Sequence, residues 1–114
     1  MGLAINAWLE PAYSCIGLMA AHLLSTTECD ALLAQRPHWS VQQGKLHRDL
    51  QFADFSEAFG FMARVALLAE AMGHHPEWSN VWNRVSIDLV THDLGGISSL
   101  DQQMAERIDA MAAG

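Results

Sequence analysis

The segment from Asp54 to Met72 is the feature that most limits what this chain can fold into. Asp54 and Glu57 have the spacing of a capping box at a helix start, and Gly73 supplies a helix stop. Apolar side chains recur at helical spacing in two stripes, one of Phe55, Phe59, Met62 and Ala66 and one of Phe61, Val65, Leu68 and Met72. Because contact with a core needs only one stripe, we expect this helix to cover a sheet with one face and to meet a partner helix with the other. The pattern predicts a homo-oligomer.

A shorter helix and a hairpin are predicted before this segment. Ser25 and Glu28 also fit a capping box, and the helix that they begin should end before Pro37. Two short runs with imperfect apolar alternation follow, separated by Gln43-Gly44. A glycine-containing turn between such runs is typical of a β-hairpin.

The part of the chain after the long helix begins with an alternating pattern. Val85, Ile87 and Leu89 alternate with polar residues between Val81 and Thr91, which predicts a strand with one wet face. Val81-Trp82 either begins this strand or forms a short partner strand, and aromatic residues such as Trp78 and Trp82 near a hairpin are usually core.

A last helix is expected after Gly95-Gly96, which ends the strand, with Ser98 as its cap. Its inner face would consist of Leu100, Met104, Ile108 and Met111. The predicted fold is α+β: an antiparallel four-stranded sheet with helices packed on one face, in the order α-β-β-α-β-β-α.

Composition limits the function. A chain of 114 residues with 51% apolar and 17% charged residues suits one compact domain. The net charge of −7 opposes nucleic-acid binding through a basic surface, and no stretch is long and apolar enough to span a membrane. Two cysteines, Cys15 and Cys29, cannot build a disulfide framework, which favours a cytoplasmic protein with reduced thiols.

The first residues form a separate segment. Residues 1–18 are apolar, but they lack the basic start of a signal peptide and contain Glu10-Pro11, whereas Met19 precedes a segment with domain character. We expect residues 1–18 to be an N-terminal extension outside the domain and residues 19–114 to form the domain. A weak export signal is the alternative.

Three of the six histidines fall at the ends of predicted elements. His74 and His75 follow the long helix, and His92 follows the strand that ends at Thr91. Rigid elements aim the side chains at such junctions, which makes them common places for working residues.

The spacing around these histidines resembles that of the pterin-4a-carbinolamine dehydratase family. The family pattern has a glutamate, three residues, His-His-Pro, an aromatic residue, a distant Thr-His and a later aspartate. The corresponding positions here are Glu70, His74-His75-Pro76, Trp78, Thr91-His92 and Asp101. The resemblance also covers the long helix and reaches back to Ser25, over roughly residues 22–110, and it does not cover residues 1–18.

The resemblance implies a dehydration without a metal or an organic cofactor. The substrate would be a 4a-hydroxytetrahydropterin, the product a quinonoid dihydropterin, and the source of the substrate an aromatic amino-acid hydroxylase. His74 and His92 would be the acid and the base, and His75 would bind and orient the pterin; imidazole populates both protonation states near neutrality. Glu70, one turn before His74, would hold that ring in one tautomer.

The remaining implied site residues have supporting roles. Backbone around Gly73 and Pro76, and around Thr91, His92 and Asp93, would contact the pterin. Asp101 is first a partner of Ser98 in a helix capping box and second a support of the site. The assembly implied by the resemblance is a homodimer or homotetramer.

Three other interpretations of the histidines remain open. Adjacent histidines are often only polar loop residues. A zinc site of three histidines, as in a metal-dependent hydrolase, is disfavoured because the helical His-x-x-x-His spacing is absent. The third is a protein-binding module, similar to a transcriptional coactivator, in which the dehydratase pocket is vestigial.

Overall fold

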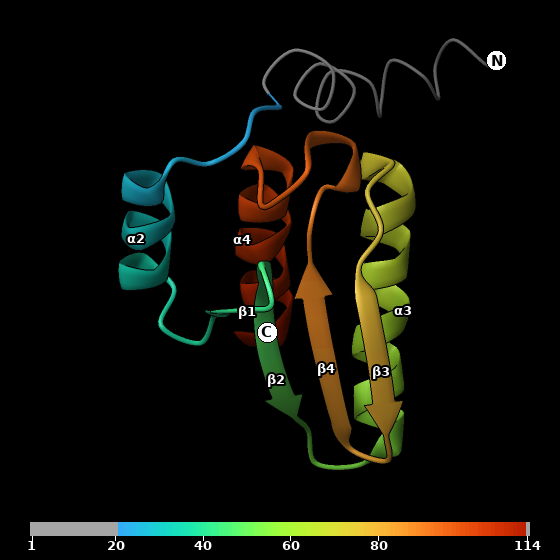
Figure 1. The fold of residues 1–114 in the computed structure, drawn as a ribbon. Helices are drawn as coiled ribbons and strands as arrows, with labels where there is room; N and C mark the ends of the chain where they lie inside the picture. The colour runs from blue at the N-terminus through green and yellow to red at the C-terminus, as the bar shows by residue number, and fades with distance from the viewer. Residues whose placement is uncertain (1–20, 114) are drawn as a thin grey trace, which may run out of the picture.

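The computed structural model describes residues 21–113, which form a four-stranded antiparallel sheet with helices on one face. The helices are α2 (Thr26–Gln35), α3 (Phe55–Met72) and α4 (Ser99–Ala113), and the strands are β1 (Ser40–Gln42), β2 (Lys45–Gln51), β3 (Glu77–Val81) and β4 (Arg84–Leu89). The strand order is β1-β2-β4-β3, and α3 and α4 lie behind the sheet in Figure 1. The predicted α+β fold is confirmed.

The cap of α2 has the predicted geometry. Ser25 Oγ accepts a hydrogen bond from the Glu28 backbone N–H at 3.1 Å, and Glu28 Oε1 accepts one from the Ser25 N–H at 2.9 Å. The helix ends at Gln35, two residues before Pro37. The start and end of α2 follow from local sequence alone.

The first hairpin turns at Gln43 and Gly44, as expected. Their φ angles of 53° and 76° are both positive, as a two-residue turn between twisted strands requires. Lys45, which begins β2, pairs with Gln42 at the end of β1. His47 of β2 pairs with Asp88 of β4, and Asp88 pairs with Glu77 of β3, so Lys45, two residues before His47, lies on the same face of the sheet as Glu77.

The second hairpin departs from the predicted strand boundaries. Val81 ends β3, the chain turns at Trp82 and Asn83, and β4 runs only from Arg84 to Leu89. The Asn83 side chain donates to the Phe52 carbonyl at 2.8 Å, a contact between distant segments that sequence alternation cannot reveal. Trp82 is 63% exposed at this turn, so the expectation that it belongs to the core is wrong.

The two stripes of α3 have different surroundings. Phe61 and Val65 are buried in the core with the inner side chains of β4, namely Val85, Ile87 and Leu89, and Leu68 of the same stripe is buried as well. Phe55 and Phe59 of the other stripe are about half exposed, and Leu67, about two turns further along the helix, is 74% exposed. The helix face that was predicted to cover the sheet is therefore the one with the Phe61 stripe.

The cap at the start of α3 differs slightly from the predicted capping box, whereas the stop at its end is as predicted. Asp54 Oδ1 accepts from the Glu57 N–H at 2.8 Å, but the Glu57 carboxylate accepts from the Ala53 N–H rather than from Asp54. The predicted capping box is thus half formed and displaced by one residue. At the other end Gly73 adopts a left-handed φ of 63°, as the predicted stop requires.

Helix α4 buries a carboxylate where an apolar residue was expected. Met104 and Ile108 are fully buried, as predicted, whereas Leu100 is only half-buried and its neighbour Asp101 is fully buried. At the opposite end Asp109 accepts from the Trp39 indole N–H at 2.8 Å and pairs with Arg48 of β2. Asp109 thus ties the last part of α4 to the sheet, whereas Asp101, near the start of α4, belongs to the candidate site.

The predicted extension, residues 1–18, lies outside the described residues. Within residues 21–113 no helix has the length and apolar character needed to cross a membrane.

We expect a chain that begins at residue 19 to have the melting temperature and the activity of the full chain, because an extension outside the domain contributes nothing to its core. Calorimetry and a rate measurement on both chains check this prediction. A large loss of either property would show that residues 1–18 pack on the domain.

Candidate active site

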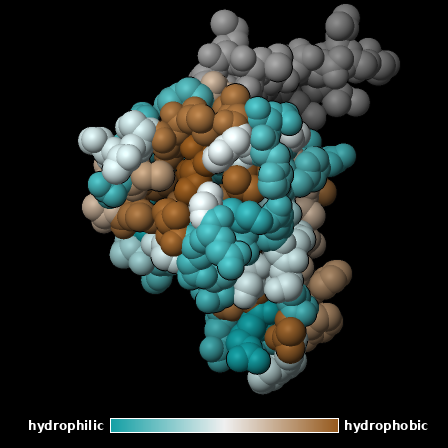
Figure 2. Space-filling model, viewed as in Figure 1, coloured by the Kyte–Doolittle hydropathy of each residue, from teal (hydrophilic) through white to brown (hydrophobic). Residues whose placement is uncertain are grey.

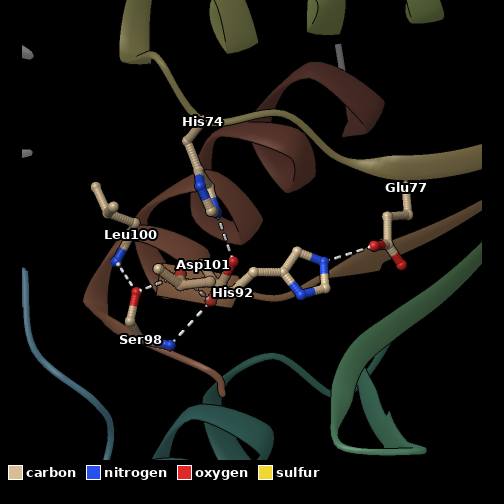
Figure 3. A network of polar contacts seen from close by, with 7 residues as sticks. His74, Glu77, His92, Ser98, Leu100 and Asp101 are labelled. Carbon is tan, nitrogen blue, oxygen red and sulfur yellow. Dashed lines mark hydrogen bonds and ion pairs between the residues drawn. The ribbon is translucent and has the colours of Figure 1, made fainter. Parts of the chain in front are cut away.

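Each of the three predicted histidines pairs with its own carboxylate. His74 Nε2 lies 2.6 Å from Asp101 Oδ1, His75 Nε2 lies 2.9 Å from Glu70 Oε1, and His92 Nε2 lies 2.9 Å from Glu77 Oε2. Figure 3 shows that His74 enters from the segment after α3 and points toward Asp101 at the start of α4, while the His92 ring points toward Glu77. Carboxylate partners fix ring orientation and stabilise an imidazolium, so the arrangement suits proton transfer.

The position of His74 follows from the end of α3. The Gly73 N–H donates to the Glu70 carbonyl at 3.3 Å and the His74 N–H donates to the Ala69 carbonyl at 3.1 Å, which is the Schellman pattern. This turn leads the chain away from the helix axis, and His74 becomes buried, with 8% of its surface exposed.

The Schellman turn also changes the partner of Glu70. Glu70 was expected to hold the ring of His74, but its carboxylate contacts His75. The expected contact assumed helical spacing through position 74, whereas the helix ends at Met72 and the left-handed Gly73 breaks that spacing. His75 and Glu70 are both well exposed, so their pair is held weakly.

Asp101 is the centre of a buried polar cluster. Its Oδ1 contacts His74, and its Oδ2 accepts from the Thr91 hydroxyl and the Ser98 backbone N–H, each at 2.8 Å. The capping contact with Ser98 is therefore present, as predicted from the spacing. The contacts with His74 and Thr91 are additional, and they make Asp101 the partner that Glu70 was expected to be.

His92 has an exposed partner that sequence reasoning did not select. Glu77 contacts His92 through Oε2 and Lys45 through Oε1, the latter at 2.5 Å. The Lys45 ammonium, and to a lesser extent His92, lowers the pKa of the Glu77 carboxyl. Glu77 follows His-His-Pro directly and was visible in the sequence, whereas Lys45 is 32 positions away and meets it only through the sheet.

The remaining predicted residues surround these pairs. Thr91 is buried, and its hydroxyl contacts Asp101, whereas the predicted backbone contact with the pterin stays a prediction. Its N–H and carbonyl close the loop to Gly96 and Gly95, and this loop carries His92 and the exposed Asp93 in a short 3₁₀ helix, His92–Leu94. Gly73 is exposed and Pro76 is half-buried. In residues 21–113 no three metal-ligating side chains converge on one point.

The amino-acid sequence matches the family model for pterin 4 alpha carbinolamine dehydratase over residues 22–111. A protein of Synechococcus sp. strain WH7803 named "Putative pterin-4-alpha-carbinolamine dehydratase" is 64% identical over 91 residues, which are 80% of this chain and 98% of that protein. A protein of Solibacter usitatus strain Ellin6076 with the same name is 58% identical over 91 residues, 80% of this chain and 96% of that protein. The chain belongs to the pterin carbinolamine dehydratase family.

Two solved structures resemble the fold. A transcriptional coactivator/pterin dehydratase from Brucella melitensis superposes with a TM-score of 0.76 at 42% identity and covers 80% of this chain and 99% of its own. A pterin dehydratase-like protein described as a RuBisCO assembly factor in the alpha-carboxysome has a TM-score of 0.56 at 25% identity and covers 67% of this chain and 88% of its own. The names of these relatives span catalysis and protein binding.

Proposed function

We propose that this chain dehydrates a 4a-hydroxytetrahydropterin to a quinonoid dihydropterin by histidine acid/base catalysis. The observation that carries the proposal is that all three histidines of the family pattern are present and each is paired with a carboxylate. The substrate would come from a pterin-dependent aromatic hydroxylase, and the reaction would recycle the pterin. Because two cysteines cannot form a disulfide framework, we propose a cytoplasmic location.

The reaction needs two proton transfers. An acid protonates the hydroxyl on C4a so that it leaves as water, and a base takes the proton from ring N5, whose electron pair forms the new C=N bond. His74 and His92 are our candidates for these two tasks, and His75, with its exposed ring, is our candidate for binding and orienting the pterin. The proposed reaction needs no metal and no organic cofactor.

The rate of dehydration tests this proposal directly. With a freshly generated 4a-hydroxytetrahydropterin, the wild-type chain should accelerate the loss of water far beyond the spontaneous rate, and a metal chelator should not change that acceleration. Disappearance of the carbinolamine absorbance provides the measurement. A wild-type chain that matched the spontaneous rate would exclude the enzyme.

A protein-binding module with a vestigial pocket is our second candidate. The exposed apolar side chains of α3, namely the contacting pair Phe55 and Phe59 and, about two turns further along, Leu67, favour it, because a group of exposed apolar residues on one helix can mark a binding surface. The Brucella and carboxysome relatives have names that refer to such roles. Absence of dehydratase activity together with an intact fold would support this candidate.

The same apolar side chains lead us to propose a homodimer or a homotetramer, assembled through α3. We expect Leu67→Glu to weaken the assembly, because a charge would enter an apolar helix contact. Sedimentation at micromolar concentration measures the effect. Ala110→Glu adds the same charge on an exposed position of α4 and should leave the assembly intact. A wild-type chain that sedimented as a monomer would contradict the proposal.

A further inference from the structure

The hydroxyl groups behind His74 form a chain of hydrogen bonds with a determined direction. Ser98 Oγ accepts from the Leu100 N–H at 3.1 Å and lies 2.6 Å from Thr91 Oγ, which in turn lies 2.8 Å from Asp101 Oδ2. A hydroxyl has one proton. If Thr91 gave its proton to Ser98, two acceptor oxygens would face each other at 2.8 Å without a proton between them. Thr91 must therefore donate to Asp101, and Ser98 must donate to Thr91.

This direction determines what Asp101 can do. Its Oδ2 receives two donors, the Thr91 hydroxyl and the Ser98 backbone N–H, so the carboxylate is held as an acceptor on that side. Its Oδ1 lies 2.6 Å from His74 Nε2. Asp101 and Ser98 are fully buried, so no water can replace these donors without opening the cluster. Asp101 Oδ1 can accept a hydrogen bond only if the His74 ring donates one from Nε2–H.

We infer that Ser98 and Thr91 are positioning residues that act through Asp101 to keep the neutral His74 ring protonated on Nε2. The other ring nitrogen, Nδ1, points away from Asp101 in Figure 3 and is then the atom that carries a lone pair. Ser98 thus has a second role besides capping α4. The tautomer follows from the geometry alone, and its meaning for catalysis rests on the proposed function.

The tautomer separates the two catalytic tasks. A neutral ring with a free Nδ1 lone pair is a base, and the buried carboxylate stabilises the imidazolium that forms when the ring takes the proton from pterin N5. His74 is accordingly the base. His92, whose carboxylate partner Glu77 is shared with Lys45, is left as the acid that protonates the departing hydroxyl.

Asp101→Asn tests this inference without substrate. The Thr91 hydroxyl and the Ser98 N–H require an acceptor at the position of Oδ2, so the amide oxygen should lie there and the amide NH₂ should face His74. The ring then has to accept, and its proton moves to Nδ1. Nitrogen-15 NMR of histidine-labelled protein, well above the ordinary histidine pKa of about 6.5, distinguishes the two tautomers.

We expect the Nε2–H form of His74 in the wild type and the Nδ1–H form in Asp101→Asn. If the variant kept the Nε2–H form, or if the wild type had the Nδ1–H form, the inference would be wrong. A change of tautomer in a chain with no dehydratase activity would leave the inference standing and remove the proposed function instead. In an active chain, Asp101→Asn should lower kcat by about 10²-fold or more, as expected for loss of a general base.

A second pair of variants tests the same inference if Asp101→Asn does not fold. Thr91→Val removes the hydroxyl donor while keeping the shape, and Thr91→Ser keeps the donor. Exchange of the His74 Nε2–H proton with solvent should be about threefold to tenfold faster in Thr91→Val, the weight of one hydrogen bond. Thr91→Ser should retain the wild-type rate. Equal exchange rates in the two variants would overturn the inference.

Because Ser98 also caps α4, a test of its role near His74 needs a control variant that loses only a helix cap. Ser98→Ala removes a capping hydroxyl from α4, and Ser25→Ala removes the equivalent hydroxyl from α2, outside the site. Both variants lose a capping hydrogen bond, and Ser98→Ala should lose more stability because its buried hydroxyl also contacts Thr91, but only Ser98→Ala should accelerate exchange of the His74 Nε2–H proton. If Ser25→Ala accelerated it equally, the effect of Ser98 would be that of a cap alone.

Discussion

The double variant His74→Ala/His92→Ala is expected to dehydrate the pterin at the spontaneous rate. Each single variant should lower kcat, because a positioned acid or base contributes about 10²–10⁴-fold to the rate and acts mainly in the transition state. The double variant removes both proposed proton carriers, and the role proposed for His75 is binding, so no third group should replace them. The dehydration rate at saturating substrate, after subtraction of the spontaneous reaction, is the measurement.

Three further variants make this experiment specific. His75→Ala should raise KM more than it lowers kcat, as expected for loss of a binding contact. His38→Ala removes an exposed histidine to which no role is assigned and should change neither constant. Because His74 faces the buried Asp101, His74→Gln, which retains an N–H donor, separates loss of the base from loss of folding. A double variant with most of the wild-type rate would refute the catalytic assignment.

Phe61→Ala is expected to lower the free energy of unfolding by about 3–5 kcal/mol. Phe61 is fully buried, lies 4.9 Å from the ring of Phe52 between centroids, and belongs to the core between α3 and the sheet. Truncation of this ring leaves a cavity between the helix and the sheet, and the surrounding residues can fill that cavity only in part. Urea unfolding monitored by circular dichroism measures the loss.

Phe59→Ala is the matched control on the same helix. Phe59 is 58% exposed, so its truncation should change the stability of the single protomer by no more than about 0.5 kcal/mol. Any larger effect should depend on protein concentration, because it would report loss of a contact between protomers. Equal, concentration-independent losses for Phe59→Ala and Phe61→Ala would contradict the assignment of the Phe61 stripe to the core.

The polar pairs of the site show why the residues could be predicted from the sequence but their partners could not. The histidines could be found because they lie at element ends and match a family spacing. Helical spacing predicted that His74 contacts Glu70. This prediction was wrong because the left-handed Gly73 ends the helix between the two residues. Asp101 is 27 positions from His74, and only the packing of α4 beside the end of α3 brings their side chains together.

The sequence by itself determined the features that depend on neighbouring residues. The capping box of α2, the glycine stop of α3, the turn at Gln43-Gly44 and the alternation in β4 are local, and each was predicted from spacing. Family membership followed as well, because the motif is a spacing of residue types. Local hydrogen bonds and side-chain periodicity have a short range, so they can be inferred from a short window of sequence.

Only the tertiary structure decided which stripe of α3 faces the sheet, where β3 ends and which carboxylate each histidine contacts. Phe55 and Phe61 are equally apolar, and burial depends on which side of the helix the sheet occupies. The link from Lys45 through Glu77 to His92 joins three segments that meet through strand pairing and the loop after β4. The energy of such contacts depends on positions that distant parts of the chain fix together, and spacing along the sequence does not contain that information.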